Sequence, residues 1–226
     1  MNGSSQRGHR PRHAGARVLH ESKSGTYRRT GAARSWLDKI RAGLYSHPIM
    51  PEQVLLFRVF VGAPSDVDEA HDVIRGQIEQ WNRDHGPLSG ARVEFTNWRT
   101  HSHPAAGSRP QALLNKQVVD QCDIMVGIFH ARFGSPTGLA DSGTEEEIRR
   151  SIKNGKKVMV YFANLATPKR KKARDEFERI EKFRDKLGRN AIYHTYTDMP
   201  AFEEAFRQHL AGVMNEVLAK EKTKLK

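Results

Sequence analysis

The feature that most constrains the fold is a series of five short apolar runs, each separated from the next by a segment with helical periodicity. The runs lie at residues 54–61, 91–98, 122–129, 158–162 and 191–196. Their β-branched and aromatic residues are typical of buried strands. Strands that alternate with helices form βαβ units and a parallel sheet. The pattern predicts an α/β fold, a flavodoxin-like doubly wound five-stranded parallel sheet with strand order 2-1-3-4-5.

The helices between these strands are predicted from apolar spacing and from residues that cap helix ends. Ser65 precedes Asp68 by three residues, which is the spacing of a capping box, so a helix is expected from Ser65 to about Asp84. Thr144 and Glu147 repeat that spacing, and Gly155 fits the other end of the same helix. The remaining helices are expected at 110–120, 168–187 and 200–220.

The charge of the chain is concentrated at one end. The 226 residues carry a formal charge of +12, and the first fifty hold ten Lys or Arg residues against two acids. That stretch has few apolar residues, so we expect residues 1–50 to form a disordered basic tail, with a short helix near 35–44. An alternative is that translation starts at Met50. The α/β domain is then expected at 51–220 and a charged C-terminal tail at 221–226.

Several classes of protein are excluded by what the sequence lacks. It has no apolar run of about 18 residues and no apolar leader, so we expect a cytoplasmic protein without a membrane partner. Its single cysteine, Cys122, excludes an internal disulfide and a cysteine-based zinc site. Neither a dinucleotide fingerprint nor a phosphate-binding P-loop follows the first strand. We expect no metal site, because a third ligand for His101 and His103 is not apparent at a recognisable spacing.

The strongest local signal is the segment from Asp141 to Ile148, which places Glu147 just after the third strand. In such sheets, ligands bind beyond the carboxyl ends of the strands. A carboxylate in the first helical turn is favoured in its ionised form by the helix dipole. An ionised carboxylate can attack a sugar's anomeric carbon or stabilise an oxocarbenium ion. The alternative role for Glu147 is to complete a capping box with Thr144.

The stretch from Arg58 to Tyr196 resembles the family of domain of unknown function 4062, a TIR-like family. The resemblance rests on pieces in the right order: Val59-Phe60-Val61-Gly62-Ala63-Pro64-Ser65-Asp66-Val67, Trp81-Asn82, Trp98-Arg99-Thr100-His101-Ser102-His103-Pro104, Arg109-Pro110-Gln111, Asp120 to Phe129, Arg132 to Gly138, and Ser142 to Ile148. The superfamily includes nucleoside deoxyribosyltransferases, whose Asp-x-Gly-Thr-x-x-Glu-Ile pattern matches Asp141 to Ile148. In those enzymes the Glu that matches Glu147 is the nucleophile. They carry Gly where this chain has Arg149, which argues against nucleoside transfer.

The resemblance to TIR enzymes that cleave NAD implies a nucleotide substrate, most simply NAD, and no required cofactor. Glu147 would then be the catalytic carboxylate. Backbone N–H groups at the helix start formed by Pro64, Ser65 and Asp66 are expected to bind phosphate. The other side chains expected around the nucleotide are Trp98 for stacking, Arg99 and Arg132 for phosphate, His101 and His103 for a hydroxyl or phosphate, and Phe129, Phe133, Gly143 and Thr144 along the pocket. Each has a structural alternative as a cap, a surface charge or a core residue.

Two other functions remain open at this point. One is a non-catalytic TIR-like module for self-association in signalling or defence, and a homo-oligomer on activation is expected in either case. The other is a nucleic-acid-binding protein that uses residues 1–50 and the basic run at 169–172. Acidic residues follow that run closely, which favours a solvated helix face over a nucleic-acid interface.

Overall fold

The structure, a computed structural model, describes residues 53–224, and its centre is a five-stranded parallel sheet. The strands are β1 (Leu55–Gly62), β2 (Ala91–Thr96), β3 (Ile124–Phe129), β4 (Lys157–Ala163) and β5 (His194–Tyr196). Their order is β2-β1-β3-β4-β5, and every neighbouring pair is parallel. The predicted α/β class and strand order are therefore confirmed, and the fold is consistent with the flavodoxin-like architecture.

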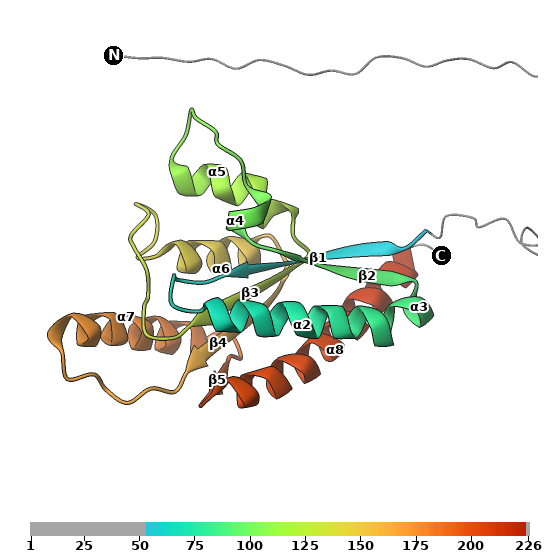
Figure 1. The fold of residues 1–226 in the computed structure, drawn as a ribbon. Coiled ribbons are helices and arrows are strands. Elements are labelled where there is room, and N and C mark those ends of the chain that lie inside the picture. The colour runs from blue at the N-terminus through green and yellow to red at the C-terminus, as the bar shows by residue number, and fades with distance from the viewer. Residues whose placement is uncertain (1–52, 225–226) are drawn as a thin grey trace, which may run out of the picture. The chain divides into compact units, whose positions relative to one another are not determined.

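Helices cover both faces of this sheet (Figure 1). The helices α2 (Asp68–Asp84) and α8 (Met199–Lys224) pack on one face, and α6 (Gly143–Lys153) and α7 (Lys171–Gly188) lie on the other. Alternate residues of β1 enter the two layers: Val59 and Val61 contact the α2–α8 side, whereas Phe60 contacts the α6–α7 side. This alternation is the period of two that a strand buried on both faces requires.

The register of the sheet brings two glycines together at its carboxyl edge. Val59 of β1 lies opposite Phe95 of β2 and Ile124 of β3, and Gly62 lies opposite Gly127. A Cβ on Gly127 would stand 2.5 Å from Cδ1 of Ile148 in α6. The absence of a side chain at this position therefore lets α6 approach the sheet closely.

Several boundaries differ from the predicted ones. Short helices that were not expected occur as α3 (Gly86–Ser89) and α4 (Trp98–His101), and the helix expected at 110–120 divides into α5 (Pro110–Gln117) and a 3₁₀ turn, η1 (Val119–Gln121). β5 is shorter than predicted. α8 continues to Lys224, so residues 221–224 belong to a helix rather than to a tail. The predicted basic tail at 1–50 lies outside the described residues.

No helix within residues 53–224 combines the length and the apolar character that crossing a membrane would need.

Candidate active site

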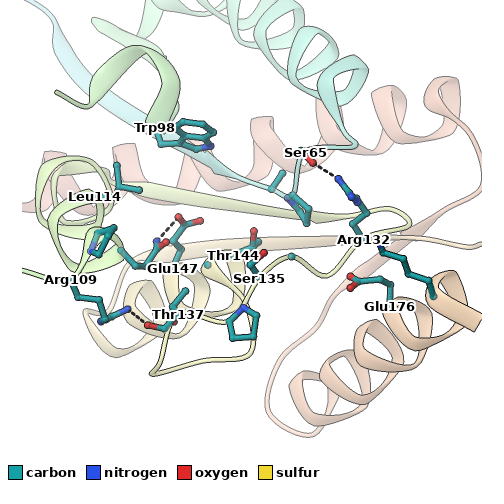
Figure 2. A pocket seen from close by; sticks show the side chains of 18 residues that line it. Ser65, Trp98, Arg109, Leu114, Arg132, Ser135, Thr137, Thr144, Glu147 and Glu176 are labelled. Carbon is teal, nitrogen blue, oxygen red and sulfur yellow. Dashed lines mark hydrogen bonds between the residues drawn. The ribbon is translucent and has the colours of Figure 1, made fainter. Parts of the chain in front are cut away.

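A cleft of about 700 Å³ opens beyond the carboxyl ends of β1 and β3, the edge at which doubly wound sheets bind ligands. Its walls come from the segments after β1, β2 and β3 and from the starts of α5, α6 and α7. The residues that line it are Ala63, Pro64, Ser65, Trp98, Arg109, Pro110, Gln111, Leu114, Arg132, Gly134, Ser135, Pro136, Thr137, Gly143, Thr144, Glu147, Lys172 and Glu176. Figure 2 shows Glu147 and Arg109 toward one end and Ser65 and Arg132 toward the other.

Glu147 reaches the cleft because of where α6 begins. Ser142 is the N-cap, and its Oγ accepts a hydrogen bond of 3.1 Å from the N–H of Glu145. The predicted capping box of Thr144 with Glu147 is therefore wrong, and Glu147 lies beyond the first turn. Its side chain is buried, with 6% of the residue exposed, and Oε1 accepts a hydrogen bond of 2.9 Å from Nε2 of Gln111.

Burial decides the charge of Glu147. It raises the pKa of this carboxyl to about 8, and the nearby charge of Glu146 acts in the same direction, while the Gln111 hydrogen bond opposes them. The carboxyl is thus largely neutral at pH 7 in this environment. The expectation that the helix dipole would keep Glu147 ionised is wrong, because the loss of hydration outweighs a dipole felt mainly in the first turn.

The neighbouring Glu146 has the opposite environment. The guanidinium of Arg109 binds its carboxylate through two hydrogen bonds, 2.7 Å to Oε1 and 2.9 Å to Oε2. The Thr137 hydroxyl donates to Oε2, and Nδ2 of Asn115 donates to Oε1 at 2.8 Å. These contacts, the Arg109 bonds above all, lower the pKa of Glu146. Two adjacent carboxyls with pKa values moved in opposite directions are a common arrangement in active sites.

Glu145, the first of the three consecutive glutamates, contacts neither Arg109 nor Gln111. It forms an ion pair with Arg149 one turn later, and its Oε2 accepts a hydrogen bond of 3.0 Å from the N–H of Asp141. Arg149 stands where the deoxyribosyltransferase pattern has Gly. In this chain it therefore serves Glu145 and does not line the cleft.

At the other end of the cleft, the predicted anion site is not at a helix start. α2 begins at Asp68, its N-cap is Val67, and no side chain caps it. Ser65 instead accepts a hydrogen bond of 2.7 Å from Nη1 of Arg132, and both side chains line the cleft with Pro64. Asp66 lies outside the lining and accepts a hydrogen bond of 2.9 Å from the N–H of Ala131.

Trp98 is the aromatic side chain of the cleft. It begins α4, is 43% exposed, and lies on the same side of the cleft as Leu114 (Figure 2). Arg99, predicted to bind phosphate, does not line the cleft. Its guanidinium lies over the Trp98 ring, 5.6 Å from the centroid, and forms an ion pair of 2.9 Å with Asp68.

Four other predicted residues lie away from the cleft. His101 contacts Thr100 near the end of α4, and His103 contacts Gln117 of α5. Phe129 and Phe133 are fully buried, and their rings stack with centroids 5.4 Å apart. They belong to the core, which was the structural alternative for both. Gly143 and Thr144 do line the cleft.

Sequence reasoning missed the polar network around Glu146 and Glu147, in which Arg109, Asn115 and Thr137 bond to Glu146 and Gln111 bonds to Glu147. Arg109, Pro110 and Gln111 were part of the resemblance but received no role. Their partners lie 36 or 37 positions away in the sequence, at Glu146 and Glu147. No periodicity or spacing rule joins residues at that separation.

The part of the chain that the structure describes contains no group of three or more His, Cys, Asp or Glu side chains arranged to hold a metal ion.

No curated protein matches the chain. The family described as Domain of unknown function (DUF4062) matches residues 58–211, a span that begins within β1, ends within α8 and contains every residue lining the cleft. The chain belongs to this family.

Proposed function

We propose that this protein cleaves the N-glycosidic bond of NAD or a related pyridinium nucleotide, with Glu147 as the catalytic residue. The observation that carries the proposal is a buried carboxyl at the carboxyl edge of the sheet, which lines a cleft large enough for a nucleotide. Only one of its oxygens, Oε1, accepts a hydrogen bond from the residues described. The other remains available to a ligand.

The positive charge of such a substrate would change the protonation state of Glu147. A pyridinium ring close to the carboxyl favours its ionised form, so substrate binding releases the proton of the neutral Glu147. When the bond between C1′ and the ring nitrogen breaks, its electron pair leaves with nicotinamide, which becomes neutral. The carboxylate then stabilises the positive charge that develops on the ribose. Water adds to C1′ and loses a proton, so the products are nicotinamide, ADP-ribose and one proton.

The remaining lining residues suit the rest of the nucleotide. Trp98 presents an exposed ring on which a base can stack. Arg132 and Lys172 supply positive charge for phosphates near Ser65. A nucleotide that spans the cleft would place its glycosidic bond near Glu147 and its phosphates near Arg132.

The test is nicotinamide release from NAD by the full chain at high protein concentration. We expect Glu147→Gln to lower turnover by about 100-fold or more, because the neutral amide cannot stabilise the positive charge that develops on the ribose. Glu79→Gln, on an exposed position of α2, is the matched control and should turn over like the wild type. The reduced dinucleotide, whose ring carries no charge, should not be cleaved.

Equal turnover by the wild type and Glu147→Gln would remove Glu147 from the mechanism. If the wild type, including any oligomer it forms, releases no base from NAD or from other nucleotides and nucleosides, the proposal fails. The non-catalytic self-association module then becomes the better explanation of the fold.

A further inference from the structure

We infer that Gln111 is a positioning residue, the last member of a directional hydrogen-bond chain that places the Glu147 proton on Oε2. The chain runs from Arg109 through Glu146, Asn115 and Gln111 to Glu147. Every link is a hydrogen bond with a defined donor and acceptor. This inference deepens the proposed function, because it states which atom of the catalytic carboxyl meets the substrate.

The direction of the hydrogen-bond chain is set by its charged end, where Arg109 binds Glu146. Glu146 is ionised, because Arg109 binds both of its oxygens, so its carboxylate can only accept hydrogen bonds. Asn115 must therefore turn its Nδ2 toward Glu146, at 2.8 Å. This leaves Oδ1 of Asn115 facing Gln111, and Oδ1 can only accept.

The same reasoning fixes the next amide. Nε2 of Gln111 donates to Oδ1 of Asn115 at 3.1 Å, and its second hydrogen reaches Oε1 of Glu147 at 2.9 Å. If the Gln111 amide were flipped, its oxygen would face the oxygen of Asn115. Oε1 of Glu147 is therefore an acceptor, and the proton of the neutral carboxyl is placed on Oε2.

Two glycines make room for this arrangement. A Cβ on Gly143 would stand 3.0 Å from Oε1 of Gln111, and a Cβ on Gly62 would stand 2.3 Å from Oε2 of Glu147. Both positions lie at the end of the sheet where the cleft opens. Side chains there would displace either the amide that sets the direction or the oxygen that carries the proton.

The consequence for the reaction is that a single oxygen changes charge. Oε2 holds the proton while the carboxyl is neutral and becomes the anionic atom when a cationic ring enters. Oε1 stays bonded to Gln111 throughout. The carboxyl group does not have to rotate between the two states, which reduces the reorganisation that charge stabilisation would otherwise require.

The test follows the pKa of Glu147 in the full chain by NMR, with ¹³C-carboxyl-labelled glutamate and Glu147→Gln to assign the signal. Gln111→Met keeps the length of the side chain but removes the donor. Because the Gln111 hydrogen bond favours the charged form, its loss should raise the pKa of Glu147 by about one unit. Gln117→Leu, which removes an amide of the same helix that contacts His103, should leave that pKa unchanged.

The direction of the shift separates positioning from a general loosening of the cleft. A loosened cleft admits water and lowers the pKa toward its ordinary value, whereas loss of the donor raises it. Gly143→Ala provides a second variant with the same expected direction, because its methyl group displaces the Gln111 amide. A fall or no change in both folded variants would overturn the inference.

Measurement of NAD turnover provides a second test, which is independent of the NMR experiment. Gln111→Met should lower kcat for NAD about tenfold with little change in KM, and it should move the pH profile of kcat with the pKa of Glu147. The NMR result does not depend on catalysis. An upward pKa shift without any NAD cleavage would support the hydrogen-bond chain and contradict the proposed function.

Discussion

The two ends of the cleft are built in different ways. Around Glu147, the side chains of Glu146 and Asn115 are buried, and their polar atoms are hydrogen-bonded to partners on α5, α6 and the segment after β3. Around Ser65, the contacts are few, and Arg132 is exposed. One end is thus fixed by a polar network before any ligand arrives, whereas the other can adjust its side chains.

This difference separates two tasks that a nucleotide-cleaving site would have. The reacting bond requires a group whose position and charge are already determined, because reorganisation during the reaction adds to the barrier. Phosphates need only positive charge within reach, since exposed arginines and lysines retain their charge and move freely. Substitutions near Glu147 should therefore change mainly the stability of the protein, whereas substitutions near Arg132 should change mainly its affinity for the ligand.

The largest expected effect is the pH dependence of stability at the Glu147 end. Glu147 has a pKa of about 8 when folded and an ordinary value near 4.5 when unfolded. Between these values the folded state retains a proton that the unfolded state releases. The free energy of unfolding should therefore fall by about 1.4 kcal/mol per pH unit from this group, starting near pH 4.5 and ending near pH 8.

Urea unfolding of the wild type and of Glu147→Gln across this range measures the effect. The variant should lack this slope, so its stability relative to the wild type should increase with pH up to about 8. Parallel curves for the two proteins would show that Glu147 titrates at its ordinary value, and the contrast between the two ends of the cleft would lose its electrostatic basis.

The next effect is steric and concerns Gly62. Its Cβ in Gly62→Ala would lie 2.3 Å from Oε2 of Glu147 and 2.7 Å from Cε of Met125. We expect a loss of about 1–3 kcal/mol in the free energy of unfolding, which is typical of an overpacked core. NAD cleavage should fall as well, because Glu147 is displaced.

Gly76→Ala is the matched control for this substitution. Gly76 lies in α2, and nothing stands within 4 Å of where its Cβ would be. Alanine there should stabilise the protein by about 0.5–1 kcal/mol through helix propensity. If Gly62→Ala is equally well tolerated, the close approach of Glu147 to β1 is not a constraint.

The smallest effect on stability is expected at the opposite end. Ser65→Ala and Arg132→Ala should each change the free energy of unfolding by less than about 0.5 kcal/mol, because both positions are on the surface. Calorimetric titration with NAD should show weaker binding for both variants. Unchanged affinity in both would place the phosphates elsewhere, and a large loss of stability would remove the contrast between the two ends.

The sheet was predictable because its signals are local. The apolar runs that became β1, β3 and β4 identify buried strands without knowledge of their neighbours, and their alternation with helices implies parallel pairing. The start of α6 was misplaced because Ser142 and Thr144 are both good caps, and only tertiary contacts choose between them. The start of α2 was misplaced because Ser65 bonds to Arg132, 67 residues away, instead of capping the helix.

The charge state of Glu147 was not predictable for a related reason. Sequence shows three adjacent glutamates, and each is equally suited to a solvated first turn. The pKa of Glu146 is lowered by Arg109, and the pKa of Glu147 is raised by burial against the sheet. Both causes exist only after α5 and the segment following β3 fold over α6.

The three glutamates of α6 are consecutive in the sequence, so their different roles depend on the rotation of the helix from one residue to the next. An α-helix rotates by about 100° per residue, which directs Glu145 toward Arg149, Glu146 toward Arg109 and Glu147 into the cleft. Inserting one residue between Ser142 and Glu145 would give Glu145 the direction of Glu146, Glu146 that of Glu147, and Glu147 that of Ile148. A glutamate would still face Arg109 and another would still enter the cleft, but the carboxylate of Glu147 would lie where Ile148 packs against Gly127 of β3. In the first two turns of α6, the rotational position of each residue around the helix axis therefore matters as much as the identity of its side chain.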